Sequence, residues 1–522
     1  MSIVSTNSRN MYLFFLMFIA VGLSLSKPLI TLGELCIGLL WLLEGNHLEK
    51  IKRFFKNRAA LVLSSVYLLT LLGLLNTTNF DFAFDDIRRK FPLFILPFLI
   101  VGFKPLTNKE FRLIFSVYVG GVIAASLWSV FVMLGGLNEV IVDKRDLSRF
   151  TSHIRFGLEV SLAIFGALYY AVKAKNTKQK ISWILSFAWL VGFLFLLNLI
   201  TGIAVTAVTI ILLVFYYGIK HHKIMMKLSA VTVVVAILAS LILYVKSCHQ
   251  EYLSFQDVEV LPMQEYSPKG EKLFHDTISS NSFRMENGNY IYRNIAEKEI
   301  EQAWNQKSNI NFDGFDNKGQ QIRFTILRFI TSQAKLKTQE AINELTPEEI
   351  NAIENGVSNF RYLDMNGIEL RLHKIFWEIE MYNKYNVADG HSVMLRWVYW
   401  HTAINIVKDN LMFGVGTGDV QDAFNQKHQQ ANIISEKYWR RAHNQYLTYF
   451  VSFGVLGGIY FLFFLLYPTI ILKQYRDYIY LCFISILMLS MLTEDTLETQ
   501  VGITFFAYFN TLLIFKKRKS SF

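Results

Sequence analysis

The chain has 522 residues, of which 52% are hydrophobic and 18% are charged. Soluble domains carry about 25% charged residues, so this composition excludes an ordinary soluble enzyme and indicates a membrane protein. The net charge of +11 could indicate a nucleic-acid-binding protein. Most lysines and arginines lie between long apolar runs, however, so nucleic acid is not expected as a partner.

About twelve apolar runs approach the length needed to cross roughly 30 Å of hydrocarbon. They cover residues 10–26, 29–43, 59–76, 91–103, 111–136, 154–172, 181–198, 202–217, 228–245, 445–468, 478–492 and 500–515. No cleavage site of small residues follows the first run, so we expect it to remain as a span. The sequence therefore predicts an all-α polytopic membrane protein with about 12 transmembrane helices.

Basic residues set the expected orientation of these spans. With the N-terminus inside, the inner connections and tail hold about 21 lysines and arginines and the short outer loops about 8, as the positive-inside rule requires. We therefore expect both termini in the cytoplasm. We expect membrane lipids as partners, and the longest connection between spans on the outer side.

One long hydrophilic block, residues 246–440, interrupts the spans between the ninth and the tenth. It is long enough to fold as a mainly helical periplasmic domain between two membrane domains, residues 1–245 and 441–522. Within it, Thr346, Pro347 and Glu349 have the spacing of a helix start with a capping box. Residues 325–336 show apolar side chains at helical spacing, and residues 311–321 have the composition of turns.

The stretch RRAHNQYLTYFVSFGVLGG, residues 440–458, places a histidine at the edge of the tenth apolar run. On one continuous helix, His443 would share a stripe with Gly454 and Gly457, because 11 residues make close to three turns. Small residues let another helix approach, so His443 would face protein and not lipid. An ordinary interfacial histidine is the alternative.

The same residues resemble a known signature. His443-Asn444, followed after nine residues by Gly454-Val455-Leu456-Gly457, is similar to the H[NSQ]-x9-G-x-x-G motif of the O-antigen ligase family. Arg396, followed by a glycine-rich turn at 413–419 (FGVGTGD), resembles that family's late loop arginine and turn. The span layout is also similar, and the central loop resembles that of ligases from Bacteroidetes-type bacteria. Residues 200–202 (ITG) depart from the Ser-Arg that many members carry there.

The resemblance implies a membrane glycosyltransferase of a bacterial inner membrane, with its large loop in the periplasm; we expect no metal or cofactor. Its donor would be a glycan on a polyprenyl diphosphate, and its acceptor a hydroxyl of a lipid A core sugar or another glycan. His443 would be the general base, since an imidazole titrates near neutral pH. Arg396 would hold the diphosphate, because a guanidinium meets phosphate oxygens with two hydrogen bonds.

Other residues are candidates for substrate binding. Arg155 and His153 precede a span on the outer side, and Arg89 and Arg441 are further outer cations; snorkelling or interfacial anchoring is the alternative for each. We list with them the residues of the two motifs, Asn444, Gly416 and Gly418. The glycines are equally consistent with a structural turn, because a glycine trio without a βαβ pattern is a weak nucleotide signal.

Acidic residues leave two questions open. Glu494, Asp495 and Glu498 either orient His443 or the acceptor, or belong to a solvated turn. Asp81, Asp85 and Asp86 in the second outer loop keep a metal-dependent mechanism possible, although the first outer loop lacks the acidic residues that such enzymes use.

Three further functions compete with ligase activity. A polymerase that joins lipid-linked repeat units, or an enzyme that transfers glycan to protein, would use the same donor and the same layout. A polysaccharide transporter is disfavoured, because the inverted repeats and matched broken helices of transporters are not apparent. We expect a monomer or a weak homo-oligomer.

Overall fold

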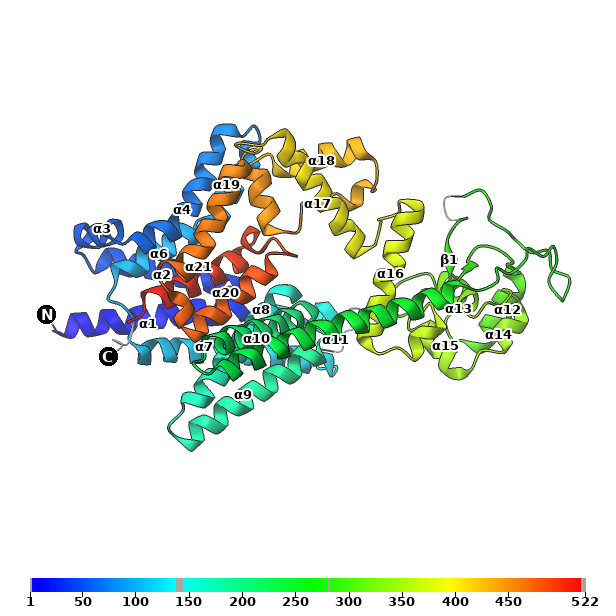
Figure 1. The fold of residues 1–522 in the computed structure, drawn as a ribbon, viewed down its shortest axis with the longest axis horizontal. Coiled ribbons are helices and arrows are strands. Elements are labelled where there is room, and N and C mark those ends of the chain that lie inside the picture. Colours follow the sequence, from blue (N-terminus) through cyan, green and yellow to red (C-terminus); the bar gives the residue numbers. More distant parts are fainter. Residues whose placement is uncertain (1, 138–143, 280–281, 518–522) are drawn as a thin grey trace. The chain divides into compact units, whose positions relative to one another are not determined.

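The computed structural model describes residues 2–137, 144–279 and 282–517 (Figure 1). The chain forms two compact units: unit 1 comprises Met1–Val231 and Val387–Phe522, and unit 2 comprises Thr232–Asn386. The end of the predicted loop domain, residues 387–440, thus packs with the membrane spans. The last residues of the basic tail, 518–522, lie outside the described residues.

All regular secondary structure in the described part of unit 1 is helical. Its helices are α1 (Ser2–Leu25), α2 (Lys27–Leu43), α3 (His47–Lys56), α4 (Arg58–Leu72), η1 (Gly73–Asn76), α5 (Phe80–Lys90), α6 (Pro92–Gly102), α7 (Asn108–Met133), η2 (Lys144–Leu147), α8 (His153–Lys173), α9 (Thr177–Leu196), α10 (Ile200–Lys220), α17 (Ser392–Asp409), α18 (Val420–Ala431), η4 (Glu436–Tyr438), α19 (Gln445–Ile470), η5 (Gln474–Arg476), α20 (Tyr478–Ser490), η6 (Thr496–Glu498) and α21 (Gln500–Phe515). The long helix α11 (Ile224–Gln256) begins in this unit and continues into unit 2.

Eight helices in the described part of the chain are long and apolar enough to cross a membrane. A ninth span results if α2 and α3, which meet at a bend of 117°, are counted together. Three predicted runs form shorter helices instead: α6 with 11 residues, α20 with 13 and α21 with 16. The chain is therefore an all-α multi-pass membrane protein, whereas the count of 12 spans is not confirmed.

The core of unit 1 surrounds α21. Every residue from Val501 to Ile514 is buried, which is expected for a helix that is apolar on all sides. α8 is similarly enclosed, by α7, α9, α10 and α20. The N-terminal ends of these two helices lie next to candidate site residues: α8 begins with His153, and α21 follows the connection that carries Glu494.

Unit 2 has its own core around Trp304 and Phe329. Its elements are α12 (Glu297–Lys307), α13 (Ile322–Ser332), α14 (Gln339–Asn343), α15 (Pro347–Glu354), η3 (Phe360–Leu363), α16 (Gly367–Tyr385) and a hairpin of β1 (Met285–Glu286) and β2 (Asn289–Tyr290). The predicted capping box is confirmed: Thr346 Oγ1 accepts the N–H of Glu349, and the Glu349 carboxylate accepts the N–H of Thr346. The helix predicted at 325–336 is also confirmed in large part, as α13.

The prediction of one continuous helix over residues 443–458 is wrong. α19 begins at Gln445, and His443 lies before it with φ +46°. The helix is also broken at Gly454, where φ is +65° and ψ is −167°. His443 and the two motif glycines therefore do not form a stripe, and their spacing serves another purpose.

Candidate active site

The break at Gly454 receives a turn from the end of the long loop. Residues 410–419 form this glycine turn, and the N–H of Val415 donates to the carbonyl of Val451 at 2.9 Å. A Cβ on Gly454 would overlap the main chain of Met412. Its backbone conformation is essentially restricted to glycine. The first motif glycine thus admits the turn into the side of the helix.

The other side of the glycine turn is fixed to the end of α4. Cβ atoms on Gly416 and Gly418 would overlap the main-chain carbonyls of Asn76 and Asn79. The Asp419 carboxylate accepts the N–H of Asn79 at 2.7 Å. These contacts are structural, and the assignment of Gly416 and Gly418 to substrate binding stays a prediction.

His443 is held by its neighbour in the motif. Asn444 caps α19: its Oδ1 accepts the N–H of Leu447 at 3.1 Å, and its Nδ2 donates to the carbonyl of Leu492 at 3.0 Å. These two bonds fix the backbone at His443, whose ring centre lies 5.9 Å from that of Tyr399 on α17. Asn444 therefore acts here as the residue that positions the histidine.

Arg396 projects from the first turns of α17 toward the connection between α20 and α21. Its Nη2 lies 3.2 Å from Oε1 of Glu494, and its Nη1 donates to the carbonyl of Ser392 at 3.3 Å. Nε of Arg396 is buried and has no hydrogen-bond partner in the described part of the chain. The same holds for Nε of Arg155, whose Nη1 donates to Ser152 Oγ at 2.8 Å. Both side chains are only partly buried, so other nitrogens of each guanidinium can meet a ligand.

A cavity of about 540 Å³ opens beside Arg396 and Glu494. Most of its lining is apolar and comes from α10 and α17, with single apolar side chains of α8 and α20; Trp397 and Trp400 of α17 lie among these residues. The cavity therefore combines an apolar lining with the ion pair of Arg396 and Glu494. Such a lining suits an amphipathic molecule with an anionic head.

Charges around His443 favour the neutral imidazole. Burial lowers the pKa of His443 below its usual value, and the nearby guanidiniums of Arg396, Arg440 and Arg155 lower it further; the Glu494 carboxylate acts in the opposite direction. The net shift is downward, so the ring is unprotonated at neutral pH. An unprotonated imidazole can accept a proton from a hydroxyl group.

Residues 345–462 match the family model described as O-antigen ligase. The chain carries an O-antigen ligase domain. The matched segment contains Arg396, the glycine turn, His443 and the break at Gly454, which are the residues that support the resemblance noted in the sequence. No curated protein matches the chain. The protein is thus a multi-pass membrane protein in which residues 345–462 are similar to the O-antigen ligase family.

Arg441 and Arg89 belong to a separate charge cluster beside the ligase motif. Arg441 Nη1 lies 3.4 Å from Oε2 of Glu498, and Arg89 forms an ion pair of 2.7 Å with Asp85. Both guanidiniums also lie over the ring of Phe82. These interactions account for the two side chains without a substrate, so their predicted role in binding stays a prediction.

The centre of this cluster is Lys90, the last residue of α5. Its Nζ lies 2.8 Å from Asp86 and 2.9 Å from Glu498, and all three side chains are buried. Burial lowers the pKa of Lys90, but the two carboxylates outweigh burial and raise it above its usual range. The cluster joins α5 to the connection between α20 and α21, which also carries Glu494. It therefore helps to fix the position of Glu494.

Two further residues complete the comparison with the predicted site. His153 begins α8, two residues before Arg155, and its Nδ1 lies 3.4 Å from Ser148 Oγ. Thr201 and Val205 of α10 line the cavity, and Thr201 belongs to the ITG sequence that departs from the family's Ser-Arg. Gly202 explains the approach of α10, because it packs directly on the backbone of Gly157 in α8. In the sequence, the glycines at positions 157 and 202 were the features that could have indicated that α8 and α10 pack closely.

Proposed function

We propose that this protein is an O-antigen ligase that transfers a glycan from a polyprenyl diphosphate to a hydroxyl of a lipid A core sugar. The reaction takes place at the periplasmic face of a bacterial inner membrane, with both termini in the cytoplasm. The observation that carries the proposal is that charged groups gather around His443 next to an apolar cavity. Arg396 and Glu494 line the cavity, and both of them, together with Arg155, act electrostatically on the His443 imidazole.

In the proposed reaction the acceptor hydroxyl oxygen attacks the anomeric carbon of the donor glycan. A glycosidic C–O bond forms, and the bond from the anomeric carbon to the diphosphate oxygen breaks. The electron pair of that bond leaves with the polyprenyl diphosphate. His443 takes the hydroxyl proton and later releases it to solvent, as its depressed pKa allows.

The arginines stabilise the leaving diphosphate in this proposal. Arg396 and Arg155 are both only partly buried, and phosphate oxygens are acceptors that a guanidinium binds well. The pairing of Arg396 with Glu494 keeps the guanidinium in place before the donor arrives. Apolar side chains from Val205, Val208 and Leu489 would contact the first isoprene units.

The test is to identify which acceptor becomes labelled. Purified protein in liposomes is given a radiolabelled polyprenyl-diphosphate glycan together with lipid A core, unlabelled lipid-linked glycan and a hydroxyl-bearing peptide. Label on lipid A core supports a ligase. Label on longer lipid-linked glycan identifies a polymerase, label on peptide identifies protein glycosylation, and unchanged donor with all three acceptors refutes transferase activity.

A further inference from the structure

A basic cavity lies at the end of α4 that is remote from the candidate active site. α4 starts at Arg58 beside this cavity, and after Leu72 the chain reaches the main chain of the glycine turn, with a hydrogen bond between Gly73 and Thr417. Fifteen residues of α-helix span about 22 Å. The basic cavity and the active site thus lie at opposite ends of one membrane span.

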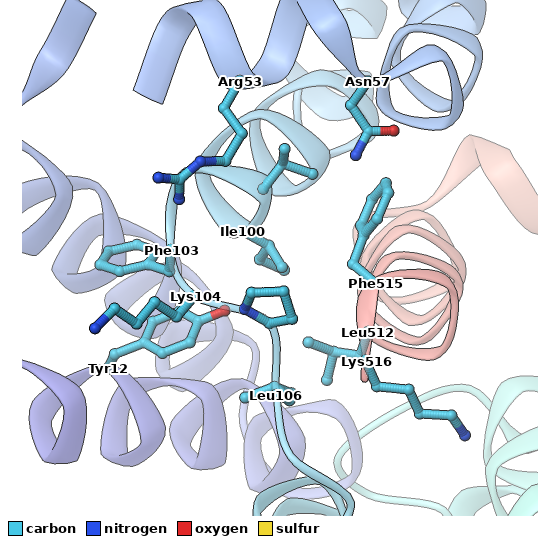
Figure 2. A pocket seen from close by; sticks show the side chains of 12 residues that line it. Tyr12, Arg53, Asn57, Ile100, Phe103, Lys104, Leu106, Leu512, Phe515 and Lys516 are labelled. Carbon is cyan, nitrogen blue, oxygen red and sulfur yellow. The ribbon is translucent and has the colours of Figure 1, made fainter. Parts of the chain in front are cut away.

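The basic cavity consists of two adjoining hollows that share Arg53 and Asn57. The larger, of about 670 Å³, is open, and most of the residues that line it are charged. The smaller, of about 100 Å³, has a floor of Ile100, Leu512 and other apolar side chains, shown in Figure 2. An open hollow with charged lining residues therefore adjoins a small apolar slot.

Positive charge dominates the lining of the two hollows. The cationic side chains are Lys52, Arg53, Lys56, Arg58, Lys104 and Lys516, and the acidic one is Glu49. Lys52, Lys56 and Arg58 are exposed and form no ion pair within the described part of the chain. Asn57 uses its Oδ1 to cap α4, which leaves its amide nitrogen directed toward the cavity (Figure 2).

The helix that carries these cations has the properties of an interfacial helix. α3 turns away from α2 by 117°, so it runs across the direction of the span that precedes it. Leu48 and Phe55 are 75% and 64% exposed on a helix that is otherwise rich in lysine and arginine. Such helices lie in the boundary between headgroups and acyl chains, with apolar side chains toward the chains.

We infer that the basic cavity binds the headgroup of an anionic glycerophospholipid, with its phosphate among Lys52, Lys56 and Arg58 and part of an acyl chain in the apolar slot. Charge complementarity selects this occupant: an excess of cations repels cationic groups and gains little from a zwitterionic headgroup. The apolar slot distinguishes a lipid from a free anion, which would leave Ile100 and Leu512 without a contact.

The test uses the full-length protein in detergent and short-chain phospholipids. Binding of dioctanoyl phosphatidylglycerol is titrated by the rise in unfolding temperature and by native mass spectrometry, with dioctanoyl phosphatidylcholine and inorganic phosphate as the comparison ligands. The variant carries Lys56→Gln and Arg58→Gln, two exposed positions. The matched control carries Lys178→Gln and Lys180→Gln, which are exposed on α9 and line neither hollow.

We expect saturable binding of phosphatidylglycerol that is about 30-fold weaker in the cavity variant and unchanged in the control, from the loss of two charges near an anionic headgroup. Three results would overturn the inference: equal affinity for phosphatidylcholine, equal weakening by both variant pairs, or binding of inorganic phosphate as tight as that of the lipid. The measurement requires no glycosyl transfer, so it is independent of the proposed reaction.

Discussion

Replacement of His443 by asparagine removes the proposed general base without adding strain to the backbone at this position. His443 has φ +46°, a conformation that costs a residue such as alanine about 1–2 kcal/mol. His443→Ala would therefore loosen the start of α19 as well as remove the base. Asparagine tolerates this conformation and has no basic nitrogen in the accessible pH range.

We expect His443→Asn to reduce kcat by about 10²- to 10⁴-fold, the usual contribution of a positioned general base. The assay is single-turnover transfer from a labelled polyprenyl-diphosphate glycan in liposomes, with donor binding measured separately and expected to be unchanged. The wild-type rate should fall tenfold per pH unit below the depressed pKa of His443, because protonation then removes the base. The rate of the variant should not show this decrease at low pH. Transfer within threefold of the wild-type rate, or an unchanged pH profile, would refute the role.

Three other substitutions test the surrounding structure. Arg396→Lys should lower kcat/KM for the donor by about 10- to 100-fold in the same assay, since one charge-assisted hydrogen bond of the guanidinium fork is lost. Gly454→Ala should destabilise the protein by more than about 3 kcal/mol in thermal unfolding, because a glycine-only conformation and an overlap with the glycine turn combine. Lys90→Met should cost about 3–5 kcal/mol in the same measurement, because two buried carboxylates lose their common partner.

Each of these substitutions has a matched control. Arg440→Lys changes an exposed arginine near the motif and should leave donor kinetics unaltered. Gly120→Ala places a methyl group in open space on α7 and should stabilise the helix by about 0.5–1 kcal/mol. Arg88→Met removes a side chain that is 82% exposed and should change stability by less than about 1 kcal/mol. Equal effects in a test variant and its control would contradict the reasoning for that pair.

Much of the fold could be predicted because apolar run length and capping chemistry are local properties. The capping box at Thr346 and the long apolar helices are of this kind. The break at Gly454 could not be predicted, because the residues around it are equally compatible with an unbroken helix. The break depends on the glycine turn, which lies about 40 residues earlier in the chain and makes its contact in three dimensions.

The candidate site shows the same division. His443 and Arg396 were identified by a motif, and the structure brings their charges near each other. Lys90 was missed because burial of a lysine depends on where two distant carboxylates come to lie, Asp86 one turn away and Glu498 about 400 residues later. Arg89, beside it in sequence, looks equally suitable and instead pairs with Asp85.

The hydrogen bonds of the glycine turn bear on how this protein can change over evolutionary time. The residues of the candidate site all belong to unit 1, and residues 410–419 are secured to α4 and α19 by their own main chain. Residues 232–344 lie in unit 2 and precede the segment that matches the family model, so a change in their length leaves these hydrogen bonds in place. Variation in that part of unit 2 is therefore compatible with a constant arrangement of Arg396 and His443.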